Sequence, residues 1–303
     1  MRFGAVTNSI PRSAALFVNG KSRKGRQQFK KACRLFREAG IELVEAHAVK
    51  KPADMPRRVA GAAKRGVPMV IVGGGDGTMS CTVDKIVGLD TVFAALPLGT
   101  ANSFARTLGL PLDLAGAVKA IADGVPKRID LGMIDDDYFA NCATIGIAPQ
   151  IAETVPHGLK SWLGRPGYLL WAARQLAAFR PFRVTIEQDG KRQSFEAVEL
   201  RVANGRFHGG VELVDDAELT SGRIVVQAVI GHGRAGLVWS WLASVLRLPQ
   251  RHAMTREFEG RSIRIETVPP LPISIDGEVL AETPVTAKVA ARAITVAAPR
   301  EPA

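Results

Sequence analysis

The feature that most constrains the fold of this chain is an apolar run that ends directly in a cluster of glycines. Val67–Val72 contains no polar side chain, and Gly73-Gly74-Gly75-Asp76-Gly77-Thr78 follows it at once. A continuous apolar run is typical of a strand that is buried on both faces, as in a parallel sheet covered by helices. Glycines after such a strand expose backbone N–H groups to an anion, and the start of a following helix favours phosphate. The pattern predicts an α/β fold with a phosphate-binding loop.

The alternation of strand and helix signals continues on both sides of this run. The expected elements are, in chain order, a strand at Ala14–Asn19, a basic helix that ends at Gly40, a strand at Ile41–Ala46, a helix at Pro56–Lys64, a strand at Thr91–Leu96, and a helix at Leu114–Ala122 capped by Asp113. Repeated strand–helix units imply a parallel sheet with helices packed on it. We therefore expect one α/β domain over residues 1–125.

The pattern changes after Pro126, where short runs rich in Val, Ile and Thr follow one another. The expected strands are Ile129–Ile134 and Tyr138–Thr144, which form a hairpin, then Val184–Gln188, Ser194–Val202, Ile224–Val229, Ser262–Glu266 and Pro284–Val296; helical stretches are expected at Gly167–Phe179 and Gly236–Leu248. Residues 126–284 are therefore expected to form a mainly antiparallel β domain. The tail, residues 285–303, can pack back on the α/β domain.

The net charge of +11 is concentrated at the front of the chain. Residues 1–65 contain 16 Lys and Arg against 4 Asp and Glu, a net of +12, whereas the remainder is close to neutral. This asymmetry suggests a phosphate-rich partner, such as a nucleotide, an anionic membrane or a nucleic acid, or else a solvated surface. The basic cluster Lys21–Arg26 has no interleaved aromatic residues for base stacking, so nucleic acid is disfavoured.

Cysteine usage and hydropathy indicate the compartment. Cys33, Cys81 and Cys142 suit neither a disulfide framework nor a zinc site. The chain has no apolar run of the roughly 20 residues that a membrane-spanning helix needs, and Met1–Asn8 shows no secretory pattern. We therefore expect a cytoplasmic protein.

A second polar loop follows the next expected strand. Pro97–Arg106 contains Thr100 and Asn102, and consecutive strands of a parallel sheet end at the same edge. This loop is therefore expected to face the glycine loop across a crevice, where Thr100 and Asn102 would bind a ligand; alternatively, its Asn and Ser cap the next helix. Asp76 would repel phosphate, so it is expected to hold Mg²⁺, a hydroxyl group or the loop itself.

Acidic residues in the second half are further candidates. Asp276 and Glu278 flank a glycine after an expected strand and can supply a base and its positioning partner, although Asp-Gly is also common in hairpin turns. Asp130 lies in an apolar strand, where a buried carboxylate needs a partner, a metal or a role. The histidines show no metal-ligand spacing and are expected at surface or capped positions; they are His47, His157, His208, His232 and His252.

Familiar nucleotide-binding motifs do not fit, because Gly20–Gln27 lacks the Lys-Ser/Thr of a P-loop and Gly73–Thr78 lacks the last glycine of a dinucleotide fingerprint. The ordered motifs instead resemble the diacylglycerol kinase catalytic-domain family of bacterial lipid kinases, which is related to sphingosine kinases and NAD kinases. The resemblance runs from about Ala15 to Val296, and the segments that carry it are GGGDGT at 73–78, PLGTANSFARTLGLP at 97–111, RIDLG at 128–132, FANCATIGI at 139–147, VANGRFHGG at 202–210 and IDGE at 275–278.

The resemblance implies an NAD-kinase-like α/β domain that binds ATP and a β-sandwich domain that binds lipid, with the site between them. Carried over by position, the residues implied to bind ATP are Asn19, Gly20, Lys21, Ser22, Arg23, Gly74, Gly75, Asp76, Gly77, Thr78, Thr100 and Asn102. The implied catalytic acids are Asp76, Asp276, Glu278 and Asp130, the last in a Mg²⁺ network. Asp216 and Glu218 are implied ligands of a structural Mg²⁺.

The chain departs from the family pattern at three places. Ser80-Cys81 stands where the family usually has Asn-Glu, Ser103 where it has Asp, and Ser221 where Asp precedes a glycine. These changes leave the identity of the acceptor open.

The function implied by the resemblance is transfer of the γ-phosphoryl group of ATP to a lipid hydroxyl, with diacylglycerol as the first acceptor. Alternatives are another lipid such as phosphatidylglycerol or a sphingoid base, NAD, or a sensor that binds nucleotide or lipid without catalysis. A lipid must be collected at a membrane surface, so we expect peripheral association through the basic residues of the front segment, with Trp239 and Trp241 as anchors.

Overall fold

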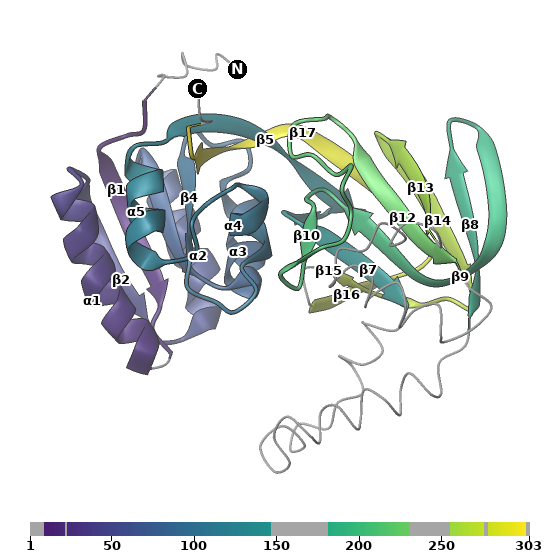
Figure 1. Cartoon of the computed structure of the whole chain (residues 1–303), viewed down its shortest axis with the longest axis horizontal. Helices are drawn as coiled ribbons and strands as arrows, with labels where there is room; N and C mark the ends of the chain where they lie inside the picture. The colour runs from purple at the N-terminus through teal and green to yellow at the C-terminus, as the bar shows by residue number, and fades with distance from the viewer. Residues whose placement is uncertain (1–8, 22, 147–180, 231–254, 276–277, 301–303) are drawn as a thin grey trace, which may run out of the picture.

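The computed structural model describes residues 9–21, 23–146, 181–230, 255–275 and 278–300 (Figure 1). The first part alternates strands and helices as β1 (Ser13–Asn19), α1 (Arg23–Glu38), β2 (Glu42–Val49), α2 (Met55–Lys64), β3 (Met69–Gly74), α3 (Asp76–Val83), β4 (Val92–Pro97), α4 (Ser103–Thr107) and α5 (Leu114–Ala122). Short 3-10 turns at Pro52–Asp54 and Asp84–Ile86 lie between them. The strands are parallel in the order β4-β3-β1-β2, which confirms the predicted α/β fold.

The order of these strands decides which helices share a face of the sheet. The chain moves from β1 outward to β2, then returns across β1 to β3 and on to β4. Because strand–helix–strand connections are right-handed, a reversal of direction sends the connecting helices to opposite faces. Accordingly α1 packs with α5, and α2 packs with α3. The reversal leaves a crevice at the carboxyl ends of β1 and β3, where ligands bind in such sheets.

The second part is a mainly antiparallel β-sandwich. Its strands are β5 (Val125–Ile134), β6 (Asp137–Phe139), β7 (Cys142–Gly146), β8 (Phe182–Gln188), β9 (Lys191–Ala203), β10 (Phe207–His208), β11 (Val211–Glu212), β12 (Ile224–Ile230), β13 (Thr255–Gly260), β14 (Ser262–Val268), β15 (Pro272–Ile275), β16 (Glu278–Glu282) and β17 (Val285–Ala298). The helical stretches expected at Gly167–Phe179 and Gly236–Leu248, with Trp239 and Trp241, lie outside the described residues.

The expected hairpin of Tyr138–Thr144 is wrong in its second half. The short strand β6 pairs with β5, but β7 leaves that hairpin and pairs with β9 and β15. Asn204 holds the segment between β6 and β7 in place. Its side-chain amide donates to the carbonyl of Ala140 at 2.9 Å, and its backbone N–H donates to the carbonyl of Asn141. Strands β13 and β16 were not expected, because charged residues obscure their alternation.

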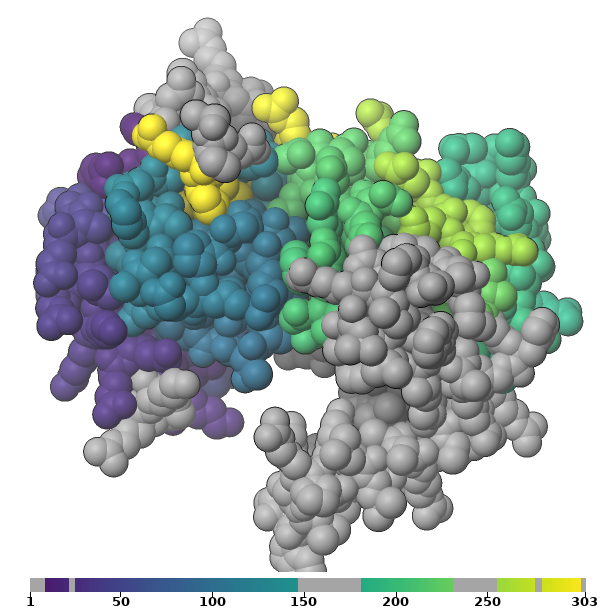
Figure 2. All heavy atoms as spheres, viewed as in Figure 1, coloured from purple at the N-terminus to yellow at the C-terminus, as the bar shows by residue number. Residues whose placement is uncertain are grey.

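The last strand, β17, joins the two parts into one fifteen-stranded sheet. Its first half pairs antiparallel with β14, and Thr295 and Val296 near its end pair in parallel with β4. Along most of its length it also pairs with β5. One core cluster fills the α/β part and includes Ile294 and Val296 of β17, and a second fills the sandwich around Leu200 and Ile265. Figure 2 shows the two parts in direct contact on one face.

Asp130 on β5 fixes the crossing of β5 and β17. Its carboxylate is 2% exposed and accepts backbone N–H groups from Gly222 and Arg292, each at 2.7 Å. Arg292 has a φ of +52° and lies where the register of β17 against β5 shifts. Asp130 therefore holds a strand irregularity and a loop in place. Each oxygen of this carboxylate thus makes a structural contact with the backbone, and the catalytic role predicted for Asp130 stays a prediction.

We expect Asp130→Ala to destabilise the protein by about 2–5 kcal/mol, because two buried N–H groups lose their acceptor. Chemical denaturation followed by fluorescence measures the change in the free energy of unfolding. Asp136→Ala, in the exposed turn after β5, is the matched control and is expected to leave stability within about 0.5 kcal/mol. Equal stability of the two variants would contradict the structural role of Asp130.

Candidate active site

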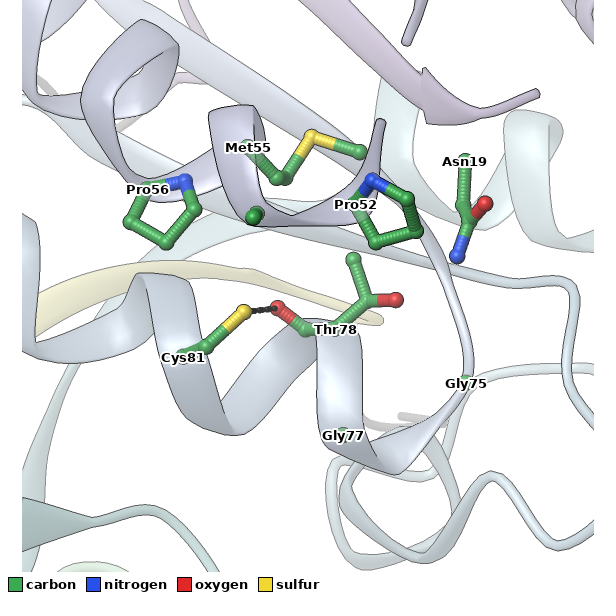
Figure 3. A pocket seen from close by; sticks show the side chains of 9 residues that line it. Asn19, Pro52, Met55, Pro56, Gly75, Gly77, Thr78 and Cys81 are labelled. Atoms are coloured by element: carbon green, nitrogen blue, oxygen red, sulfur yellow. Dashed lines mark hydrogen bonds between the residues drawn. The ribbon is translucent and has the colours of Figure 1, made fainter. Parts of the chain in front are cut away.

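A cavity of about 580 Å³ opens where β1 and β3 end (Figure 3). Its volume is in the range of small-molecule and cofactor sites. The residues that line it are Asn19, Pro52, Ala53, Met55, Pro56, Gly75, Gly77, Thr78 and Cys81. This is the crevice that the reversal of strand order creates, so the predicted glycine loop and the end of β1 do meet at one cavity.

The first turn of α3 forms one wall of this nucleotide-sized cavity. The first four N–H groups of a helix have no partner inside the helix, and the N-terminus carries partial positive charge. Gly75 is the residue before α3 and is extended, and Gly77 follows inside the first turn without a side chain to cover the backbone. A phosphate can therefore approach this backbone closely.

Two glycines let the two predicted loops touch. A Cβ atom on Gly99 would lie 2.4 Å from the Cα atom of Gly75, a distance that no side chain tolerates. The backbone N–H of Leu98 also donates to the carbonyl of Gly74 at 2.9 Å. The glycine loop and the Gly99 loop therefore pack backbone against backbone, as the sequence led us to expect for loops at one sheet edge.

Asn102 has a role that neither expectation named. Its side-chain oxygen accepts the N–H of Gly99 at 2.9 Å and its amide donates to the carbonyl of Gly99 at 3.0 Å. Asn102 is 6% exposed, has a φ of +51°, and makes no side-chain cap to α4. Asn102 thus shapes the loop through Gly99 and does not cap α4, and its predicted contact with a ligand stays a prediction. Thr100 is exposed and lines neither cavity described here.

Asp76 links the same two loops. Its Oδ1 atom accepts the N–H of Phe104 at the start of α4 at 3.3 Å. Three roles were expected for Asp76, and this hydrogen bond shows one of them, which is to hold the glycine loop against the start of α4. The carboxylate also lines a second cavity, on the other side of α3 from Gly77 and Thr78.

This second cavity, of about 190 Å³, lies between the two parts of the chain and is called here the interdomain cavity. Its lining comes from α3, α4, the segment before β7 and the β10–β11 hairpin, and consists of Asp76, Met79, Ser80, Ser103, Phe104, Ala140, Asn141, His208 and Gly209. Residues 76, 79 and 80 face it, whereas 77, 78 and 81 face the larger cavity. Helical spacing therefore makes α3 a wall shared by both cavities.

Hydrogen bonds clamp the two parts together around the interdomain cavity. The N–H of Gly210 donates to the hydroxyl of Ser103 at 3.0 Å, and the hydroxyl of Thr107 donates to the side-chain oxygen of Asn141 at 3.0 Å. The amide of Asn141 donates in turn to the carbonyl of Phe207. Sequence reasoning named Ser103 as a departure and as a possible helix cap, and it passed over Asn141. It expected His208 at a surface or capped position, whereas His208 is partly buried and lines the interdomain cavity.

The basic segment after β1 borders the larger cavity. The side chain of Asn19 lines it and accepts the backbone N–H of Lys21 at 3.2 Å. The guanidinium of Arg26 donates to the carbonyl of Gly20 at 3.2 Å, so it holds the turn into α1. Of the other residues predicted here, Ser22 lies outside the described residues and Arg23 begins α1.

Of the predicted acids of the second part, the structure describes Asp216, Glu218 and the backbone of Glu278. Asp276 lies outside the described residues, and Glu278 is the first residue of β16, opposite Ile275. Asp216 is exposed, and the carboxylate of Glu218 pairs with Arg206 at 3.0 Å. Within the described part of the chain no group of three or more His, Cys, Asp or Glu is placed to hold a metal.

The loop around Glu218 does not fit a structural Mg²⁺. The hydroxyl of Ser221, at the position of the missing Asp, donates to backbone carbonyls of Glu218 and Arg223 at 3.1 and 3.2 Å. Gly222 donates to Asp130. The loop is thus closed by its own hydrogen bonds, one oxygen of Glu218 is paired with Arg206, and no carboxylate stands at the position of Ser221 to serve as the oxygen ligand that a hard cation prefers. The predicted metal role of Asp216 and Glu218 is not supported by these contacts.

Comparison with protein families accounts for both parts of the chain. The family model "Diacylglycerol kinase catalytic domain" matches residues 13–134, and "YegS C-terminal NAD kinase beta sandwich-like domain" matches residues 143–298. The chain belongs to this lipid kinase family. The expected family is therefore confirmed.

Individual relatives agree with the family assignment. "Diacylglycerol kinase" of Bacillus subtilis (strain 168) is 35% identical over 206 residues, which are 65% of this chain and 68% of that protein. "Probable lipid kinase YegS" of Salmonella typhimurium is 32% identical over 225 residues, 72% of this chain and 75% of that protein. A crystal structure of a diacylglycerol kinase from Bacillus anthracis superposes with a TM-score of 0.75 at 25% identity, over 95% of this chain and 97% of that one.

In the described part of this family member, no helix is long and apolar enough to cross a membrane.

Two glycine substitutions distinguish an effect on the stability of the site from an effect on its affinity for ligand. A Cβ on Gly77 would meet nothing within 4 Å, so Gly77→Ala is expected to keep or slightly raise stability while placing a methyl group in the larger cavity. Gly99→Ala forces apart the backbones of Gly99 and Gly75 and is expected to lower stability by more than about 1 kcal/mol. Thermal melting and ATP titration by calorimetry measure both effects. If Gly77→Ala bound ATP as tightly as the native chain, the larger cavity would not be the phosphate site.

Proposed function

We propose that this chain transfers the γ-phosphoryl group of ATP to the hydroxyl group of a lipid, with diacylglycerol as the first acceptor. The observation that carries the proposal is the position of α3. One face of this helix lines a cavity of nucleotide size, and the other presents Asp76 to the interdomain cavity. A phosphoryl group at the start of α3 would therefore lie between donor and acceptor.

Phosphoryl transfer needs mainly positioning and charge neutralisation from the protein. The start of α3 supplies N–H groups and a favourable dipole. The exposed lysines at 21, 50 and 51 lie within two residues in sequence of Asn19 or Pro52, which line the larger cavity. Such a charge distribution raises the local concentration of a polyanion such as ATP. Mg²⁺ belongs to this reaction as part of the MgATP substrate, where it neutralises phosphate charge.

The basic helix α1 supports contact with an anionic membrane. Exposed cations along it include Lys30, Lys31, Arg34 and Arg37. Figure 1 places α1 at the far end of the α/β part from the sandwich, so we propose that it contributes long-range attraction rather than contact with the acceptor. The catalytic pair proposed from the resemblance, Asp276 and Glu278, remains a prediction.

Cys81 reports on nucleotide binding. Its thiol lines the larger cavity and is partly buried, whereas Cys142 is 1% exposed and burial raises the pKa of the Cys33 thiol. We expect iodoacetamide to modify Cys81 first in the folded protein, and MgATP at ten times its dissociation constant to slow that reaction about tenfold. Mass spectrometry of tryptic peptides measures the rates, and Cys81→Ser should abolish the protected site. Labelling of Cys81 at the same rate with and without MgATP would argue against the nucleotide site.

The acceptor is tested with vesicles. Purified protein and radiolabelled ATP are incubated with vesicles that contain diacylglycerol, phosphatidylglycerol or a sphingoid base, with and without added anionic lipid, and with NAD as the soluble alternative. We expect labelled phosphatidic acid, more of it on anionic vesicles, and a decrease as salt is raised, because surface charge is screened over about 10 Å at 0.1 M salt. Labelled NADP would indicate the NAD-kinase alternative. ATP protection of Cys81 without any labelled product would indicate a sensor.

A further inference from the structure

A third cavity, of about 570 Å³, lies where the end of α4 meets the start of β5, the segment after β9 and the end of the described chain. It is called here the arginine cavity, after Arg106, Arg206 and Arg300 in its lining. Its volume matches that of the nucleotide-sized cavity at α3. The proposed kinase function gives this cavity no role, although it is large enough for a ligand.

Two of the three arginines are held in the same way by the backbone. The Nε atom of Arg106 donates to the carbonyl of Ala101 at 2.9 Å, and the Nε atom of Arg300 donates to the carbonyl of Asp123 at 2.9 Å. Each of these bonds uses Nε and leaves the Nη groups of the guanidinium for other partners. Because the guanidinium is planar, a fixed Nε also orients its terminal N–H groups before any ligand binds.

The charges in the lining leave the arginine cavity positive. Arg206 donates through Nε to the carbonyl of Ala217 at 3.4 Å and pairs with the carboxylate of Glu218 at 3.0 Å. Of the remaining charged residues, Lys127 adds to the two fixed arginines, and Glu212 is the opposing carboxylate. The lining thus carries four cations against two carboxylates. An anion is the ligand that this balance favours.

The type of cation and the apolar lining narrow the class of anion. Oriented guanidinium groups, with a lysine beside them, match the oxygens of a phosphate group in particular. Buried apolar side chains of Leu108, Ile129 and Leu219 line the same cavity. They suit the carbon-bearing part of a phosphate ester.

We propose that the arginine cavity is a second binding site, which takes a phosphate group between Arg106, Lys127 and Arg300. The phosphate comes either from the headgroup of a lipid such as phosphatidic acid or from a soluble phosphate. The site is separate from the larger cavity at α3, with which it shares no lining residue.

The arginine cavity and the interdomain cavity share two elements. The start of α4 lines the interdomain cavity, whereas Arg106 and Thr107 at its end line the arginine cavity. On β10, Phe207 lines the arginine cavity and His208 the interdomain cavity. The hydroxyl of Thr107 also donates to the side chain of Asn141, which lines the interdomain cavity.

This shared wall makes the second site a regulatory one. A phosphate bound to Arg106 relieves the repulsion among the cations and favours the position of α4 in which both cavities are formed. Binding of phosphate therefore strengthens binding of the acceptor, and by thermodynamic linkage the acceptor strengthens binding of phosphate by the same factor. This step rests on the proposed function, in which the acceptor hydroxyl enters the interdomain cavity.

Binding is tested by calorimetry with two probes, inorganic phosphate and soluble dihexanoyl phosphatidic acid. The larger cavity is first filled with the magnesium complex of a non-hydrolysable ATP analogue, and protection of Cys81 verifies that it is filled. We expect one site in the native chain and affinity about tenfold lower in Arg300→Gln, because one charge-assisted contact is lost. Arg300 is exposed, so this variant is expected to keep the fold, which thermal melting checks.

Arg192→Gln is the matched control. Arg192 is exposed, pairs with Glu266 and lines none of the three cavities, so affinity should stay within about twofold of native. Tighter binding of phosphatidic acid than of inorganic phosphate would identify a lipid headgroup as the source, and equal binding would identify soluble phosphate. Absence of binding of both probes, or equal affinity of the native chain and Arg300→Gln, would overturn the site.

The regulatory role is tested with inorganic phosphate, which cannot enter the interdomain cavity as a lipid product. At a concentration that saturates the site, we expect it to lower KM for the acceptor found above by at least about fivefold without changing kcat. Arg300→Gln should keep its basal activity and lose this response. An unchanged KM in the native chain with the site filled would overturn the regulatory role. Phosphate binding by a native chain that phosphorylates no acceptor would instead contradict the proposed function and leave the site standing.

Discussion

The pairing of β17 with both parts of the chain is the contact on which the rest of this structure depends. The strand enters from the sandwich beside β14, runs along β5 and ends in parallel with β4. Backbone hydrogen bonds therefore continue from the lipid kinase's β-rich part into its α/β part, so the two cores are held at a defined relation. Asp130 secures the irregular point of this crossing by accepting N–H groups from β17 and from the loop at Gly222. A cavity that lies between the two parts can keep its shape only if this crossing is rigid.

The second constraint is the backbone contact between Gly75 and Gly99. It brings the ends of β3 and β4 together so closely that α3 starts beside the Gly99 loop, and Asp76 reaches Phe104. Asn102 stabilises the Gly99 loop in the required conformation. In consequence α3 stands between two cavities, with glycine backbone and Thr78 on one side and Asp76, Ser80 and Met79 on the other. A helix start shared in this way suits transfer of a phosphoryl group from one side to the other.

Departures from the family pattern lie at the two cavities beside α3 and at the loop that ends in Gly222. Ser103 removes a carboxylate from the interdomain cavity, Cys81 removes one from the larger cavity, and Ser221 closes its loop through backbone carbonyls. The buried ion pair Glu199–Arg201 on β9 carries a desolvation cost. Its two charges act in opposite directions on the pKa of His208.

The sequence by itself determined the α/β part, the glycine loop after its third strand and the family, because their signals are local. A fully apolar strand such as Val67–Val72, the glycines that follow it and the cap at Asp113 act within a few residues. The cap was found as expected, and the strand was found two residues later, at Met69–Gly74. Only the tertiary structure decided the partners of Asp130, the contact of Asn102 with Gly99, and the place of His208 opposite Asp76. A carboxylate in an apolar strand can serve a metal, a substrate or a distant backbone N–H, and the sequence pattern is the same for all three. Which of these partners a carboxylate has depends on strand β17 and the β10–β11 hairpin. Both are distant in sequence from the residues they contact, so no local pattern predicts the donors and acceptors that they contribute.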